Sequence, residues 1–146
     1  MERRDFIKTT CAVCIGGYIS VSMLEGCGTT KMVTGSIFGP NLVIPLSDFK
    51  AKNGDHAEYE ECVIVHNETL QYPICMFRIG DNQYNALWMR CTHQGTELHL
   101  SGDRFECPAH GSQFDNRGMV LRGPAAVNLK TFPVTIENTQ LKVSLK

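Results

Sequence analysis

Two short groups of metal-ligating residues stand out between positions 91 and 115, in the stretch CTHQGTELHLSGDRFECPAHGSQFD. The first group holds Cys91 and His93, separated by one residue, and the second holds Cys107 and His110, separated by two. The segment between the groups is long enough to fold back, so two thiolates and two imidazoles can converge on one site. Zinc accepts both ligand types in a tetrahedron. A non-redox zinc-binding domain is therefore one hypothesis for this chain.

The order of the ligands favours a different centre. Zinc sites of this composition usually take both cysteines from one arm and both histidines from the other, whereas here each arm supplies one of each. That mixed order suits a two-iron cluster in which one iron takes both thiolates and the other both imidazoles. Gly95 and Gly111 follow the two arms, as expected where the backbone must approach a cluster without a Cβ in the way. The pattern indicates a [2Fe-2S] cofactor.

The two boxes, CTHQG and CPAHGSQFD, resemble those of the Rieske iron–sulfur proteins. Residues 123–125, Gly-Pro-Ala, resemble the proline loop that covers the cluster in that family. The resemblance implies that Cys91 and Cys107 bind one iron and that His93 and His110 bind the other.

The resemblance also assigns a role to Ser112 and exposes several departures from the family pattern. Ser112 matches a serine that donates a hydrogen bond to a bridging sulfide, so it is expected to bind the cofactor. Thr96 and Ala109 stand where the respiratory cytochrome bc subgroup has a disulfide between the boxes, and polar Gln94 stands where that subgroup usually has an apolar residue. Phe114 replaces a tyrosine that donates to a cysteine ligand in high-potential members. We therefore expect a lower reduction potential than in the bc-type proteins, and electron transfer is better supported than quinol oxidation.

Short apolar or alternating segments separated by turns predict the scaffold that holds these boxes. The predicted strands are residues 42–44, 59–66, 72–79, 84–89, 127–132, 134–136 and 140–145, with turns at 67–70 and 80–82. Few segments could form a long helix. The sequence predicts an all-β fold, a small antiparallel domain over residues 41–146 with the two cluster-binding loops at one end.

The first 40 residues have a different character. Residues 1–8, MERRDFIK, resemble a twin-arginine export signal, and the weakly apolar residues 9–24 are shorter and more polar than a spanning helix of about 20 residues. Cys27, in the segment LEGC, resembles the acylated cysteine of a lipobox; an uncleaved signal that remains as an anchor is the alternative. Residues 28–40 are rich in Gly, Thr and Ser and predict a linker. The expected organisation is thus a signal or anchor over 1–27, a linker over 28–40 and a domain over 41–146.

Composition narrows the choice of partners. The chain has 146 residues and a formal net charge of −1, with no basic run outside its N-terminus. Nucleic acid is therefore not expected as a partner, because phosphate binding needs clustered positive charge. No nucleophile with a base at a known spacing and no phosphate loop is found, which favours an electron-transfer subunit of an oxidoreductase over a stand-alone catalyst.

The resemblance and the N-terminal signal together imply where the protein acts. They predict one-electron transfer by a carrier or subunit of a membrane-associated respiratory oxidoreductase complex, tethered to the outer face of a prokaryotic cytoplasmic membrane. The expected redox partner is a cytochrome or another membrane oxidoreductase subunit. The small subunit of a molybdenum-type oxidase is an alternative.

The remaining cysteines and histidines of the domain receive no ligand role. Cys62 and Cys75 fall symmetrically about the turn near residues 68–69, so they could face each other across a hairpin. A disulfide between them and a pair of free buried thiols both remain open. His56, His66 and His99 lie in loop or strand-end positions and are expected to be solvated.

Overall fold

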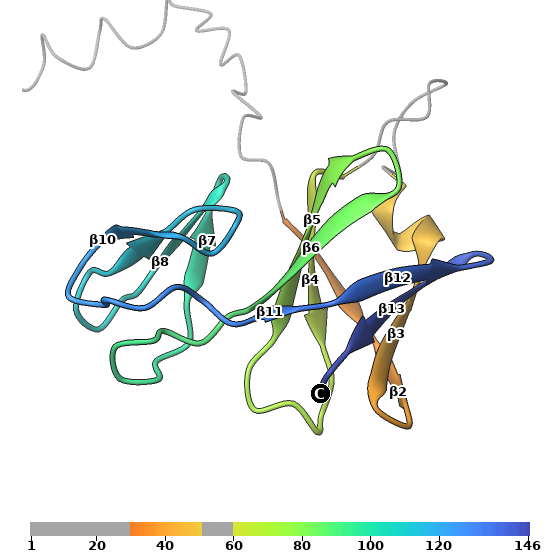
Figure 1. Ribbon diagram of the computed structural model, residues 1–146, viewed down its shortest axis with the longest axis horizontal. Coiled ribbons are helices and arrows are strands. Elements are labelled where there is room, and N and C mark those ends of the chain that lie inside the picture. The colour runs from red at the N-terminus through yellow and green to blue at the C-terminus, as the bar shows by residue number, and fades with distance from the viewer. Residues whose placement is uncertain (1–29, 51–59) are drawn as a thin grey trace, which may run out of the picture.

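The computed structural model describes residues 30–50 and 60–146, which form an all-β domain of two lobes (Figure 1). The predicted fold class is confirmed. Within the described residues the one helical element is the 3-10 helix η1, Leu46–Phe49, and no helix there is long and apolar enough to cross a membrane. The predicted export signal, Cys27 and His56 lie outside the described residues.

Three sheets make up the domain. The central sheet has the strand order β1-β4-β5-β6-β11, the outer sheet β12-β13-β3-β2, and the small sheet β10-β9-β8-β7. The strands are β1 Lys31–Thr34, β2 Ser36–Phe38, β3 Asn41–Pro45, β4 Cys62–His66, β5 Ile74–Gly80, β6 Gln83–Trp88, β7 His99–Ser101, β8 Arg104–Glu106, β9 Gln113–Phe114, β10 Val120–Arg122, β11 Thr131–Phe132, β12 Val134–Glu137 and β13 Gln140–Ser144.

The central sheet is buried on both faces. Along β4, Val63 and Val65 contribute to an apolar core shared with the outer sheet, whereas Ile64 contributes to a second core shared with the small sheet. The neighbouring strand β5 divides in the same way, with Met76 in the first core and Phe77 in the second. The predicted strand at residues 59–66 is present over Cys62–His66, but the prediction that it is half-buried is wrong, because a sheet covered on both sides takes a continuous apolar run.

The predicted linker over residues 28–40 is wrong for the part that the structure describes. Strand β1 pairs parallel with β4 and extends the central sheet, while β2 pairs with β3 in the outer sheet. Gly35, between them, is buried, and a Cβ there would lie 2.7 Å from side-chain atoms of Leu42 and Val65. The absence of a side chain at Gly35 therefore permits close packing, and Val33 and Ile37 pack against the core.

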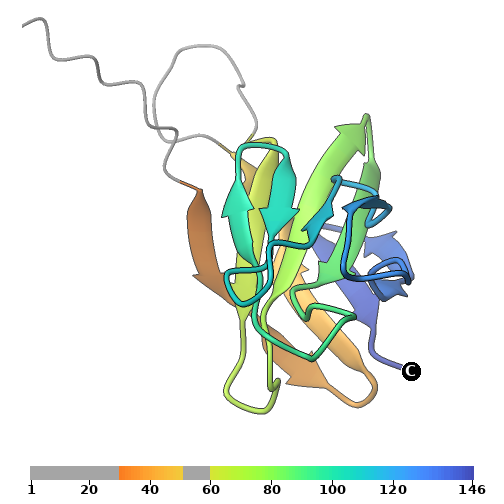
Figure 2. The ribbon, with the colours of Figure 1, turned by 90° about the vertical axis from the view of Figure 1, so that its left-hand side faces the viewer.

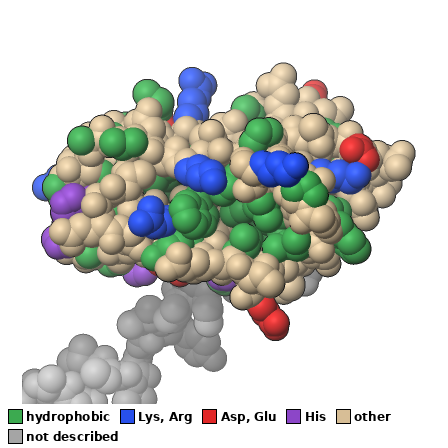
Figure 3. Space-filling model, turned by 60° about the horizontal axis from the view of Figure 1, so that its bottom comes forward, with side chains coloured by type: hydrophobic (Ala, Val, Ile, Leu, Met, Phe, Trp, Pro, Cys, Tyr) green, Lys and Arg blue, Asp and Glu red, His purple; other side chains and the backbone are tan. Residues whose placement is uncertain are grey.

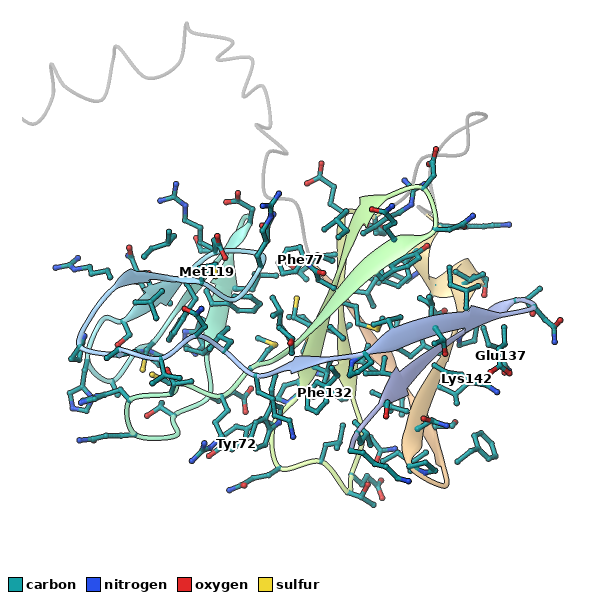
Figure 4. The ribbon with its side chains drawn as sticks, in the orientation of Figure 1. Tyr72, Phe77, Met119, Phe132, Glu137 and Lys142 are labelled. Carbon is teal, nitrogen blue, oxygen red and sulfur yellow. The ribbon has the colours of Figure 1, made fainter. Side chains whose placement is uncertain are left out.

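The small lobe is inserted in the chain between β6 and β11 of the central sheet (Figures 1 and 2). Its entry and exit are adjacent, since Thr131 pairs with Leu87 and Phe132 with Ala86. The predicted strand at 127–132 is limited to its last two residues, because the preceding segment forms a loop over the lobe. Phe77 of the central sheet lies between the lobes (Figure 4), where its ring meets Phe105 edge-on with centroids 5.7 Å apart.

Cys62 and Cys75 are both free thiols, which contradicts the disulfide hypothesis. Their strands do form the predicted hairpin, but the register pairs Cys62 with Phe77 and Cys75 with Ile64. The two cysteines are therefore diagonal rather than opposite neighbours on one face. Diagonal Cβ atoms are separated by more than the roughly 4 Å that a disulfide requires.

Candidate metal centre

The first cluster loop, residues 91–96, begins three residues after β6 ends. Its backbone closes on itself. The Gly95 N–H donates to the Cys91 carbonyl at 2.8 Å, and the Cys91 N–H donates to the Thr96 carbonyl at 2.8 Å. Gly95 has a φ of +78°, a left-handed conformation that glycine adopts without steric cost. The loop is thus a tight turn built around the Cys91 backbone.

The second cluster loop, residues 107–112, repeats this design. The Gly111 N–H donates to the Cys107 carbonyl at 2.9 Å, the Cys107 N–H donates to the Ser112 carbonyl at 2.9 Å, and Gly111 has a φ of +75°. Strands β8 and β9 pair on either side of this loop and hold its ends together. Each predicted ligand pair is therefore presented by the same kind of hydrogen-bonded turn.

The structure brings all four predicted ligands to one end of the small lobe. Cys91 and Cys107 are each 1% exposed, whereas His93 and His110 are exposed to solvent. The two imidazole rings meet edge-on, with centroids 5.0 Å apart and planes at 89°. Figure 3 shows histidine side chains at this end of the molecule. The site thus has two thiols on the inside and two imidazoles on the outside.

A third loop, residues 123–128, lies against both cluster loops and includes the predicted proline-loop segment. The Ala125 N–H donates to the Ser112 hydroxyl oxygen at 3.0 Å, and the Thr92 hydroxyl donates to the Val127 carbonyl at 2.5 Å. Ser112 is fully buried. Because its oxygen accepts from Ala125, its hydroxyl hydrogen is free to donate toward the site, as its predicted role requires.

The two thiols interact, and the local backbone favours the thiolate form of Cys107. Burial raises the pKa of the Cys107 thiol, but hydrogen bonds from the His110 and Ala109 backbone, together with the side chains of Cys91 and Thr96, outweigh burial and lower it. Cysteines bind metals as thiolates. The pocket is therefore suited to a bound cation.

The donors form two pairs rather than one group. The Cys91 and Cys107 side chains interact with each other, and the His93 and His110 rings meet each other edge-on. A structural zinc site needs four donors around one ion, whereas a two-iron cluster needs two protein donors at each iron. The residues present fit a [2Fe-2S] cluster, with Cys91 and Cys107 as one pair and His93 and His110 as the other.

Of the other residues discussed from the sequence, one lies beside the predicted ligand cysteines and two lie away from the cluster loops. Phe114 is fully buried in the same apolar cluster as Cys91 and Cys107, while His66 and His99 lie in strands β4 and β7, outside the cluster loops. Sequence reasoning missed Thr92 and Tyr72, which hydrogen-bond to the third loop and to the first loop respectively. Tyr72 lies 19 residues before Cys91 in the chain, so no local pattern links them.

Comparison with known proteins agrees with this geometry. The profile of the Rieske [2Fe-2S] domain matches residues 42–133. The cytochrome b6-f complex iron-sulfur subunit of Synechococcus sp. (strain RCC307) is 43% identical over 68 residues, which are 45% of this chain and 36% of that protein. The chain therefore matches little more than a third of that relative.

A solved structure supports the fold, and a second solved structure is similar in sequence. A chain of the complex of reduced oxygenase and oxidized ferredoxin in carbazole 1,9a-dioxygenase is 28% identical, with a TM-score of 0.51 over 73% of this chain and 94% of that one. The cyanobacterial plasma membrane Rieske protein PetC3 from Synechocystis PCC 6803 is 27% identical, with a TM-score of 0.49 over 58% of this chain and 87% of that one. Since the matched profile covers more than half of the sequence, the chain belongs to the Rieske [2Fe-2S] domain family and its cofactor is a [2Fe-2S] cluster.

Proposed function

We propose that the chain transfers one electron at a time through its [2Fe-2S] cluster, with Cys91 and Cys107 binding one iron and His93 and His110 binding the other. The observation that carries this proposal is the pair of equivalent loops, each of which presents one thiol and one imidazole. The bound cluster supplies a one-electron carrier whose potential is raised by having two neutral imidazoles in place of two thiolates. Ser112 contributes a hydrogen-bond donor from beneath.

The exposure of the proposed ligands indicates the side of the site at which a redox partner binds. Both thiols are shielded from solvent, so a partner approaches the imidazole side, where His93 and His110 are exposed. Electrons enter and leave through these two rings.

The N-terminal sequence supports a location of this domain at a membrane. Residues 1–8 and 9–24 resemble a twin-arginine signal, followed by Cys27 as an acylation site or by retention of the uncleaved signal as an anchor. In either case the domain is tethered to the outer face of a prokaryotic cytoplasmic membrane. Because the sequence relatives are subunits of the cytochrome b6-f complex, we infer a cytochrome or membrane oxidoreductase subunit as the redox partner.

A free-standing electron carrier is a second candidate. The structural match to the oxygenase–ferredoxin complex extends over 94% of that chain, whereas the match to the cytochrome-complex subunit covers 36% of that protein. Co-purification from membranes separates the two: a respiratory subunit is recovered with cytochromes, and a free-standing carrier is recovered alone.

Voltammetry of the full-length protein tests the electron-transfer role. The proposal expects a reversible one-electron wave from the wild-type protein that is lost in His93→Ala and in His110→Ala. His99→Ala is the matched control, since His99 lies in β7 outside the cluster loops, and it should leave the wave unchanged. A wave that persists in His93→Ala, or one that is lost in His99→Ala, would contradict the assignment of His93 and His110.

A further inference from the structure

The first cluster loop is held by a side chain from outside the small lobe. Tyr72, in the connection between β4 and β5, donates its hydroxyl to the Gly95 carbonyl. In Figure 4 Tyr72 lies at the junction of the two lobes. Gly95 in turn donates its N–H to the Cys91 carbonyl at 2.8 Å. One chain of hydrogen bonds therefore runs from the larger lobe to the backbone of a cluster ligand.

Trp88 orients this contact. The Tyr72 ring meets the Trp88 ring edge-on, with centroids 5.6 Å apart and planes at 80°, a favourable aromatic geometry. The Arg90 guanidinium lies 5.4 Å from the centre of the same Trp88 ring. Tyr72 is thus supported against the end of β6, immediately before the loop begins.

The Arg90 side chain packs against Gly95 at the position where a Cβ would be. A Cβ on Gly95 would lie 3.0 Å from the Arg90 Nη2 and 3.2 Å from its Nε, so the guanidinium packs closely on the glycine. The Gly95 carbonyl is therefore fixed by Tyr72 while its Cα faces Arg90. Since His93 lies two residues earlier in the same closed turn, movement of Gly95 would also displace its imidazole.

We propose that Tyr72 is a positioning residue for the cofactor: its hydroxyl, supported by Trp88, fixes the first cluster loop at Gly95 and thereby sets the orientation of the His93 ring. This inference rests on the proposed ligand role of His93. It adds a residue from the larger lobe to a site whose predicted ligands all lie in the small lobe.

Hydrogen–deuterium exchange on the full-length protein as purified tests the proposal. Tyr72→Phe keeps the ring on Trp88 and removes only the hydroxyl. Loss of one hydrogen bond is expected to speed exchange at the Gly95 amide by roughly two- to twelvefold, while a peptide covering Gly111 is unchanged. Tyr84→Phe is the matched control, because the Tyr84 ring packs edge-on against Phe49 in the larger lobe, with centroids 4.9 Å apart.

A second measurement separates positioning of His93 from a general loosening of the fold. The EPR g-values of the reduced protein depend on the imidazole ligands, and they should shift in Tyr72→Phe but not in Tyr84→Phe. The bleaching of the visible absorption on warming should also be faster in Tyr72→Phe alone. Unchanged g-values in Tyr72→Phe would overturn the proposal even if exchange at Gly95 becomes faster, and so would exchange at Gly95 equal to that of the wild type. Iron and sulfide content, measured on the same samples, tests the proposed function separately.

Discussion

Replacing Ser112 with alanine should weaken the fold through the loss of one hydrogen bond and, by the role proposed for its hydroxyl, lower the reduction potential. The Ser112 oxygen accepts from the Ala125 N–H at 3.0 Å, and Ala125 is only 4% exposed. Without the oxygen, this buried N–H loses its partner, which costs about 1–3 kcal/mol. For a chain of this size each kcal/mol lowers the thermal unfolding midpoint by roughly 4 °C. We therefore expect a fall of about 4–12 °C in Ser112→Ala.

The Ser112 oxygen accounts for the expected loss of stability, whereas the Ser112 hydroxyl hydrogen accounts for the expected change in reduction potential. A donor near sulfur stabilises the extra negative charge of the reduced state, so its removal lowers the midpoint potential. Calorimetry and protein-film voltammetry on the same preparations measure the two effects. Ser101→Ala, on an exposed strand residue, is the control for the substitution itself. An unfolding midpoint equal to wild type, or a potential that rises, would refute the reasoning.

Three further predictions concern residues in or against the apolar cluster that contains Cys91 and Cys107. Phe114→Tyr should raise the midpoint potential, because a hydroxyl is added in the apolar cluster that contains both predicted ligand cysteines; an unchanged value in voltammetry would mean that the ring edge faces away. Gly118→Ala should lower the free energy of unfolding by roughly 1–3 kcal/mol in denaturant titrations, since Gly118 has a φ of +81° and a Cβ would lie 2.9 Å from a Leu87 methyl carbon; a smaller loss would show that this leucine moves aside. Iodoacetamide should modify Cys62 before Cys75 in mass spectrometry, because a hydrogen bond with Cys75 lowers the pKa of Cys62, whereas burial raises that of Cys75; equal rates would contradict this order.

The buried Cys75 thiol contributes a stability change with a defined sign above pH 9. The folded Cys75 thiol stays protonated above its ordinary pKa of 9.0, while the unfolded thiol ionises there. The unfolded state then binds fewer protons, so the free energy of unfolding falls as the pH rises above about 9. Cys75→Ala should show a shallower fall in urea titrations above pH 9. A slope identical to wild type would rule out this contribution.

Local patterns predicted which side chains come together, and long-range packing made part of the fold unpredictable. The spacing in the two boxes singled out four candidate ligands that the structure brings together, because each box is a self-contained turn. Gly35 was misinterpreted as part of a linker, since its close contact with Val65 comes from a strand about 30 residues away.

The wrong disulfide hypothesis and the unassigned role of Tyr72 also reflect long-range packing that the sequence does not reveal. The disulfide hypothesis depended on symmetry about a turn, but hairpin register is set by cross-strand packing, and a shift of two residues makes opposite partners diagonal. Tyr72 could not be assigned to the site, because its contact with Gly95 depends on how the lobes meet.

Quantification of iron, acid-labile sulfide and zinc in the purified full-length protein tests the central claim most directly. The account predicts two irons and two sulfides per chain, as a [2Fe-2S] cluster requires, with both lost in Cys107→Ser and retained in His99→Ala. Stoichiometric zinc in protein from iron-replete cells, or iron without acid-labile sulfide, would contradict it.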